Sequence, residues 1–310
     1  MTGLELCNEI MKEVNSVIIG KEDVVKKILS CFLAGGNVLI DDIPGVGKTT
    51  MAIAFARAMN LNVNRIQFTP DVMPSDVVGF SMFDPSDKTF KYKEGVVFCN
   101  LLLADEINRT SSKTQSALLE SMEERKVTVD GVVRKLPDPF MVIATQNPVG
   151  SVGTHSLPDS QLDRFMIRIT VGYTDSSSEI DMLKSKEDIN PLDNVKSIAT
   201  PEIFKQLQEQ VSQVFIHDKV YKYIVDIVNK TRNNEDVKLG VSPRGSLALS
   251  NMSRAYAFLS GRDYVTPDDV LAVVNDTLCH RMIMGERAGV FLRAEDTLSE
   301  IVKGIKIDVE

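Results

Sequence analysis

The sequence predicts an α/β fold in which helices cover a parallel sheet, followed by a smaller, all-helical domain. Short apolar runs alternate with helical patterns over residues 1–195. Alternating strands and helices are typical of a parallel sheet covered on both faces. From residue 196 to residue 310, only helical patterns remain. We therefore expect an α/β domain over 1–195, a linker within 188–200 and a helical domain over 196–310.

Hydrophobic spacing places the elements of the first domain. Some segments repeat apolar residues near the helical period, whereas others are the continuous apolar runs typical of buried parallel strands. Helices are expected at 4–17, 22–34, 48–59 and 111–124. Strands are expected at 38–40, 63–68, 101–104, 141–144 and 165–169. Asp130-Gly131 lies within an alternating stretch at 127–136, which predicts a β-hairpin.

The second domain is marked by its helix starts. Thr200-Pro201 and Thr266-Pro267 each place threonine at an N-cap and proline at the first helical position. Apolar residues follow Pro267 at helical spacing. These signals predict helices, not strands, in this part of the chain.

Composition bounds the class of protein. The 310 residues carry a formal net charge of -8 and contain no basic run of five or more residues. Binding along a nucleic-acid backbone needs clustered lysine and arginine, so the charge balance argues against it. The four cysteines form no Cys-x-x-Cys pair, so no zinc site is expected. Without a signal-peptide pattern or an apolar run of about 18 residues, we expect a cytoplasmic protein with no membrane insertion.

A glycine-rich segment lies between the strand at 38–40 and the helix at 48–59. It consists of Pro44, Gly45, Val46, Gly47, Lys48, Thr49 and Thr50. Glycine lets backbone N–H groups turn inward around an anion, and a helix N-terminus adds positive partial charge. Lys48 can reach the β- and γ-phosphates of ATP, and the Thr49 hydroxyl can ligate Mg²⁺. We therefore expect residues 44–50 to bind Mg-ATP.

One position departs from the usual phosphate-binding pattern, which has glycine six residues before the lysine. Asp42 stands there. Aspartate tolerates unusual turn geometry, and residues 44–49 form most of the cradle. We expect nucleotide binding to be retained.

An acidic pair follows the apolar run at 101–104. Ligands bind at the carboxyl ends of the strands in open α/β sheets, so Asp105 and Glu106 should lie beside the glycine-rich segment. We expect Asp105 to hold Mg²⁺. Glu106 is expected to polarise the attacking water as a general base.

Three further polar residues are candidates. Asn147 follows the strand at 141–144 and could orient the attacking water, or it could be a turn residue before Pro148. Arg164 and Arg244 could stabilise a γ-phosphate, in cis or in trans. The alternative for each arginine is a surface ion pair.

Longer motifs resemble those of the MoxR family of AAA+ ATPases. Besides PGVGKT, they are QFTPDVMPSDVVG (67–79), LLLADEINR (101–109), TQSALLESMEERKVTVDG (114–131), ATQNP (144–148), LPDSQLDRF (157–165), VSPRG (241–245) and GRDYVTPDDV (261–270). The resemblance spans roughly residues 14–285. The chain departs from the family pattern at residues 95–98 and 150–152, where contacts with phosphate are not expected.

The resemblance implies an AAA+ P-loop NTPase core with a parallel sheet, followed by an all-helical lid domain. It makes Asn147 the first sensor, Arg164 an arginine finger acting in trans and Arg244 the second sensor. It makes residues 80–96 an insertion in the second helix of the core, and 126–136 a hairpin before the first sensor.

The resemblance also implies an assembly and a task. Family members form homo-oligomeric rings, usually hexamers, with ATP at the subunit interfaces. They remodel protein substrates to mature or activate them. Some of their partners carry von Willebrand factor A domains, and some maturation events involve the insertion of a metal or cofactor.

Other functions stay open on the sequence. The insertion and the hairpin are shared with helicase-type relatives, so a DNA-associated motor or a transcriptional regulator is an alternative. Magnesium-chelatase ATPase subunits look similar in architecture. A nucleotide-gated scaffold with negligible turnover is a third alternative, and Glu106 argues against it.

Overall fold

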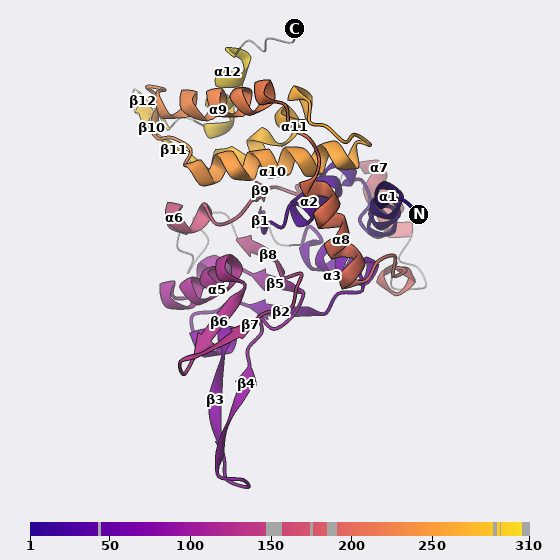
Figure 1. Ribbon diagram of the computed structural model, residues 1–310, viewed down its shortest axis with the longest axis vertical. Helices are drawn as coiled ribbons and strands as arrows, with labels where there is room; N and C mark the ends of the chain where they lie inside the picture. Colours follow the sequence, from indigo (N-terminus) through magenta and orange to yellow (C-terminus); the bar gives the residue numbers. More distant parts are fainter. Residues whose placement is uncertain are drawn as a thin grey trace.

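The computed structural model describes residues 1–42, 45–146, 157–173, 176–184, 191–287, 290–291 and 293–305. Its centre is a five-stranded sheet in the order β2-β5-β8-β1-β9, with every neighbouring pair parallel (Figure 1). The strands are β1 (Val38–Asp41), β2 (Val63–Gln67), β5 (Leu101–Asp105), β8 (Met141–Gln146) and β9 (Ile167–Ile169). The predicted parallel α/β sheet is therefore present, and β1 lies inside it between β8 and β9.

Helices cover both faces of the sheet. Successive side chains of a strand point to opposite faces, so a strand that is buried along its length must be covered on both sides. Val38 and Ile40 pack with α1 (Gly3–Asn15), α2 (Glu22–Leu33) and α3 (Lys48–Ala58) in one hydrophobic cluster. Leu39, between them, belongs to a second cluster that includes residues of α5 (Ser112–Glu124). The hairpin of β6 (Lys126–Val129) and β7 (Val132–Lys135) follows α5.

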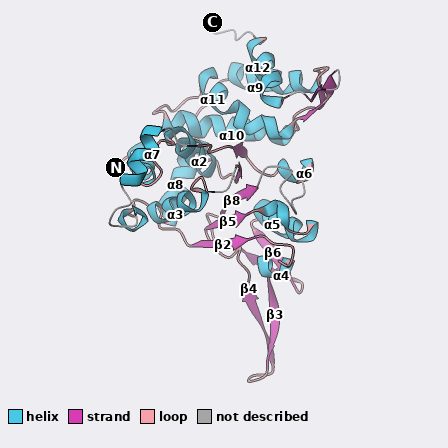
Figure 2. Ribbon diagram, turned by 180° about the vertical axis from the view of Figure 1, so that it is seen from behind, coloured by secondary structure: helices cyan, strands magenta, loops and turns pink. Residues whose placement is uncertain are grey.

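A long antiparallel hairpin projects from the core. It consists of β3 (Gly79–Asp84) and β4 (Thr89–Glu94), and Figures 1 and 2 show it extending away from the sheet. The short helix α4 (Pro74–Val78) precedes it, whereas residues 95–100 form turns up to β5. The insertion expected at 80–96 is thus a β-hairpin attached to one short helix.

The second part of the chain is a helical lid at the carboxyl side of the sequence. Its helices are α8 (Pro201–Ser212), α9 (Asp218–Arg232), α10 (Pro243–Leu259), α11 (Pro267–Leu278) and α12 (Ala294–Lys303). Thr200 caps α8 by accepting from the Ile203 N–H, and Thr266 forms a capping box with Asp269 at α11. These caps follow from the Thr-Pro pairs, since a threonine oxygen satisfies a donor that the first helical turn leaves unpaired.

The lid also contains two small strand pairs that the sequence did not predict. They are β10 (Val237–Leu239) with β11 (Ile283–Met284), and β12 (Glu286–Arg287) with β13 (Val290–Phe291). Runs of two or three residues are too short to show a hydrophobic alternation. We propose that the boundary between core and lid lies near residue 195, after the short helix Pro191–Asn194.

The remaining described elements connect these layers. They are α6 (Asp159–Leu162), α7 (Ser176–Lys184), and single turns at Ile107–Arg109 and Cys279–Arg281. No described helix is long and apolar enough to cross a membrane.

Candidate functional site

The glycine-rich segment joins β1 to α3 at the carboxyl end of the sheet. Gly45 and Gly47 have φ angles of 92° and 87°, in the left-handed region that favours glycine. An added Cβ would meet no heavy atom within 4 Å at either glycine, so the backbone conformation, not the space, requires glycine there. Gly47 is the N-cap of α3, and the N–H groups of the first helical turn therefore open toward the same space. Pro44 lies outside the described residues.

Lys48 begins α3 and is largely buried, with 9% of its surface exposed. Its Nζ donates to the carbonyl oxygen of Asp42 at 2.5 Å. Burial lowers the pKa of Lys48, and the negative charges of Asp42 and Asp105 oppose that shift. Lys48 is therefore a desolvated cation at the base of the loop, where it can bind an anion.

Asp42 stands where the usual pattern has glycine, and its side chain makes a contact that glycine could not make. Its Oδ2 accepts a hydrogen bond from the backbone N–H of Gly172 at 2.6 Å, just beyond β9. This carboxylate oxygen therefore ties the start of the loop to the neighbouring strand's exit. Its backbone carbonyl accepts from Lys48 Nζ, so Asp42 contacts the loop through both its side chain and its backbone.

The acidic pair lies at the end of β5, as predicted. Thr145, near the end of the adjacent strand β8, contacts both acids through Oγ1. It donates to Asp105 Oδ1 at 3.3 Å and accepts from the Glu106 N–H at 2.9 Å. The sheet neighbour thus fixes the placement of both acids; the sequence analysis did not identify Thr145.

Glu106 has a strained backbone, with a φ of 55°. A non-glycine residue in the left-handed region is uncommon, and such residues cluster at functional sites. The Arg109 guanidinium donates to Glu106 Oε2 at 2.7 Å. The turn Ile107–Arg109 therefore brings a cation back to the Glu106 carboxylate.

Arg65 and Gln67 also line this site, and the sequence analysis missed both. Arg65 lies on β2 and donates from Nε to Asp105 Oδ2 at 2.8 Å. Because β2 pairs in parallel register with β5, the carboxyl ends of the two strands meet. The signal available in the sequence was the polar pattern of β2, but spacing alone does not say which strand lies beside β5.

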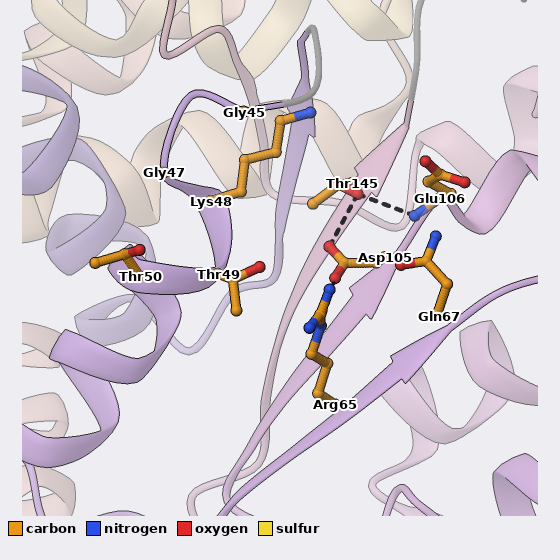
Figure 3. A pocket seen from close by; sticks show the side chains of 10 residues that line it. All are labelled: Gly45, Gly47, Lys48, Thr49, Thr50, Arg65, Gln67, Asp105, Glu106 and Thr145. Atoms are coloured by element: carbon orange, nitrogen blue, oxygen red, sulfur yellow. Dashed lines mark hydrogen bonds and ion pairs between the residues drawn. The ribbon is translucent and has the colours of Figure 1, made fainter.

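Together these groups surround one cavity of about 340 Å³. Its described lining consists of Gly45, Gly47, Lys48, Thr49, Thr50, Arg65, Gln67, Asp105, Glu106 and Thr145. Figure 3 shows the start of α3 on one side and the ends of β5 and β8 on the other. Val46 lies outside this lining and packs at the edge of the hydrophobic core.

The cavity fits a nucleotide phosphate with a divalent cation. The positive-φ glycines and helix start supply N–H donors, and Lys48 supplies a buried cation. The Thr49 hydroxyl and the Asp105 carboxylate are the oxygen ligands that Mg²⁺ prefers.

The two predicted arginines meet elsewhere. Arg164 Nε lies 3.4 Å from Glu123 Oε2, and Arg244 donates to Oε1 of the same carboxylate. Both arginines and Glu123 line a second cavity of about 270 Å³. Neither arginine is among the described residues of the first cavity. Asn147, the predicted first sensor, lies outside the described residues.

Similarity to known proteins agrees with this geometry. Residues 37–167 match the ATPase family associated with various cellular activities (AAA), and residues 229–301 match the AAA lid domain. The chain is 46% identical over 306 residues to the uncharacterized protein YeaC of Bacillus subtilis, covering 98% of this chain and 96% of that protein. It is 39% identical over 281 residues to the chaperone MoxR1 of Mycobacterium tuberculosis, covering 88% of this chain and 74% of that protein.

A solved structure shows the same fold. It is a "putative ATPase" from Cytophaga hutchinsonii, with a TM-score of 0.90 and 34% identity, covering 98% of this chain and 96% of that one. The chain therefore belongs to the MoxR family of AAA+ ATPases.

Proposed function

We propose that this protein binds Mg-ATP in the cavity between the glycine-rich loop and β5, and hydrolyses it to ADP and phosphate. One observation carries the proposal: Lys48, Thr49, Asp105 and Glu106 come from separate parts of the chain and line the same cavity. Membership of an ATPase family supports it.

Each group has a distinct role in this proposal. Lys48 and the loop N–H groups hold the phosphates, and Thr49 and Asp105 would hold Mg²⁺, which neutralises phosphate charge when bound. Glu106 accepts the proton of the attacking water. Asn147 orients that water.

Arg164 and Arg244 act, in this proposal, on the ATP of a neighbouring subunit. Both arginines form ion pairs with Glu123, and neither is among the described residues that line the cavity of Lys48. A ring, which we propose is a hexamer, would place this arginine pair against the next subunit's γ-phosphate. An arginine supplied in trans contributes about 10³–10⁵ in turnover in well-studied NTPases.

A mixing experiment tests the shared site, in which ATP bound at Lys48 of one subunit meets Arg164 of its neighbour. Lys48→Ala removes the cation that holds the phosphates, so this variant should neither bind nor hydrolyse ATP. Arg164→Ala should bind ATP like the wild type and hydrolyse it poorly. Mixed rings should recover part of the activity, because an intact Lys48 site can meet an intact Arg164 of its neighbour. If no ratio restores activity although subunit exchange is verified by fluorescence transfer, Arg164 does not act in trans.

We further propose that hydrolysis drives the remodelling of a protein partner. Partners with a von Willebrand factor A domain are the first class to examine, as the family resemblance implies. Tagged Glu106→Gln protein would be used to capture partners in the presence of ATP, with Lys48→Ala as the matched control. Proteins enriched only by Glu106→Gln, identified by mass spectrometry, would support the proposal; identical captures by the two variants would contradict it.

The DNA-motor alternative is weakened by the β6-β7 hairpin. Lys126 pairs with Glu124 at 3.1 Å, and Arg134 donates to the carbonyls of Val129 and Val132. Two of the hairpin's cations are thus already engaged. We expect ATP turnover to be unchanged by single- or double-stranded DNA at low salt, where phosphate contacts are strongest.

A further inference from the structure

We propose that Arg281, a lid residue, is a positioning residue that holds the backbone carrying Arg164. The proposal rests on the function proposed above, in which Arg164 acts on the neighbour's ATP. Its evidence is a buried hydrogen-bond network between the turn Cys279–Arg281 and residues 163–166.

The Arg281 guanidinium donates hydrogen bonds to residues that precede and follow Arg164 in the sequence. Its Nε donates to Asp163 Oδ1 at 2.8 Å, and Nη1 donates to the Met166 carbonyl at 3.1 Å. Its Nη2 donates to the Phe165 carbonyl at 2.6 Å and to the Asp163 carbonyl at 3.3 Å. One planar group therefore holds three residues of a four-residue segment, a geometry that lysine cannot reproduce.

Other contacts also hold that segment, since the Met166 N–H donates to the Asn37 carbonyl at 2.9 Å and the Phe165 side chain is buried in the core. The segment follows the single helical turn Asp159–Leu162 and precedes β9. The Arg164 side chain is itself 31% exposed and makes an ion pair at 3.4 Å, which constrains the backbone weakly. The Arg281 side chain is only 2% exposed, so its bonds are the desolvated ones.

The same network reaches the start of α10, which carries Arg244. The second oxygen of Asp163 accepts from Ser242 Oγ at 3.1 Å, and Ser242 is the N-cap of α10. A Cβ on Gly245 would lie 3.0 Å from Arg281 Cδ and 2.3 Å from Val241 Cγ1. Glycine at position 245 thus lets α10 begin directly against Arg281.

These contacts connect the lid to the segment that carries Arg164, the proposed arginine finger. Asp163 and Arg281 join the segment of Arg164, the start of α10 and the end of α11 at one point. A buried ion pair is weak evidence for stability alone, since the desolvation of both charges offsets much of their attraction. The fork geometry around Arg164 instead favours a positioning role.

The test separates positioning from folding. Arg281→Ala should bind ATP as the wild type does and lose roughly 10²-fold in turnover, the scale expected for misplacement of a catalytic group by about 1 Å. Adding Arg164→Ala to Arg281→Ala should cost little more, because both changes disable the same group. Arg281→Lys should remain deficient although it keeps the charge.

Arg262→Ala is the matched control. Arg262 pairs with buried Asp269 in the lid, away from residues 163–166, and its loss should leave turnover within about twofold of wild type.

Complementation decides the case. Arg281→Ala mixed with Lys48→Ala should regain activity, as Arg164→Ala does, because the Lys48→Ala subunits supply intact fingers. Arg281→Ala mixed with Arg164→Ala should not regain activity. If Arg164→Ala is complemented by Lys48→Ala but Arg281→Ala is not, the positioning role is overturned while the shared site stands. If neither is complemented, the shared site itself fails. Should Arg281→Ala not fold, Arg281→Lys takes its place in the mixtures with the same expectations, because it keeps the charge but loses the fork of donors.

Discussion

Thr145 Oγ1 accepts a hydrogen bond from the backbone N–H of Glu106 at 2.9 Å. The bond joins the ends of two neighbouring strands, β8 and β5, at the point where the proposed general base leaves the sheet. It also satisfies the N–H of a residue held at a φ of 55°. The conformation of Glu106 therefore depends on a side chain that takes no part in the proposed reaction.

Thr145→Val should impair hydrolysis more than ATP binding. Valine has nearly the same shape but cannot accept from the Glu106 N–H or donate to Asp105, and an unpaired buried donor costs about 1–3 kcal/mol. We expect turnover to fall by tenfold or more with the ATP dissociation constant nearly unchanged, measured by steady-state hydrolysis and nucleotide titration. Thr145→Ser keeps the hydroxyl and should stay close to wild type. Equal turnover in both variants would refute this role.

Arg65→Ala should weaken ATP binding. Arg65 is the second cation in the described lining of the cavity, beside two acids, and its loss leaves a more negative surface facing a triphosphate. Because 55% of its side chain is exposed, solvent screens the effect, and we expect an affinity loss of about three- to tenfold. Arg65→Lys should lose less. Titrations with a fluorescent nucleotide at fixed Mg²⁺ measure this, and tighter binding by Arg65→Ala would reverse the assignment.

His280 should make the fold less stable in acid. Burial, and then the neighbouring Arg281 charge, lower the pKa of His280 well below its ordinary value. Below about pH 6.5 the unfolded chain takes up a proton at this position that the folded chain does not, so stability falls with pH by up to ~1.4 kcal/mol per unit. Urea unfolding at several pH values between 7 and 5 measures the slope. His280→Gln should show a smaller slope; equal slopes would mean that His280 does not contribute.

The sheet and the acidic pair were predictable because their signals are local. The apolar run before Asp105 marks a buried strand, and the glycines before Lys48 mark a left-handed turn followed by a helix. Such features need no knowledge of which strands are neighbours. The predicted strand ended at Ala144, whereas β8 continues to Gln146 and brings Thr145 into the site.

The residues missed by the sequence analysis depend on long-range pairing. Arg65 reaches Asp105 only because β2 lies beside β5, and Glu123 joins two arginines that are 80 residues apart in the sequence (244 − 164 = 80). Glu123 is one of several glutamates on α5, and helical spacing does not single it out. Arg281 shows no motif at all, and its role comes from burial against residues 163–166. Asn147 and the hexameric ring stay predictions.

The most direct test of the account is a comparison of ATP binding and hydrolysis in the same preparation of Glu106→Gln. Glutamine fills the same space but cannot accept the proton of the attacking water. We predict wild-type affinity for ATP and turnover reduced roughly 10²–10⁴-fold. Hydrolysis within a few-fold of wild type, with binding intact, would contradict the assignment of Glu106 as the base and with it the proposed mechanism of this cavity.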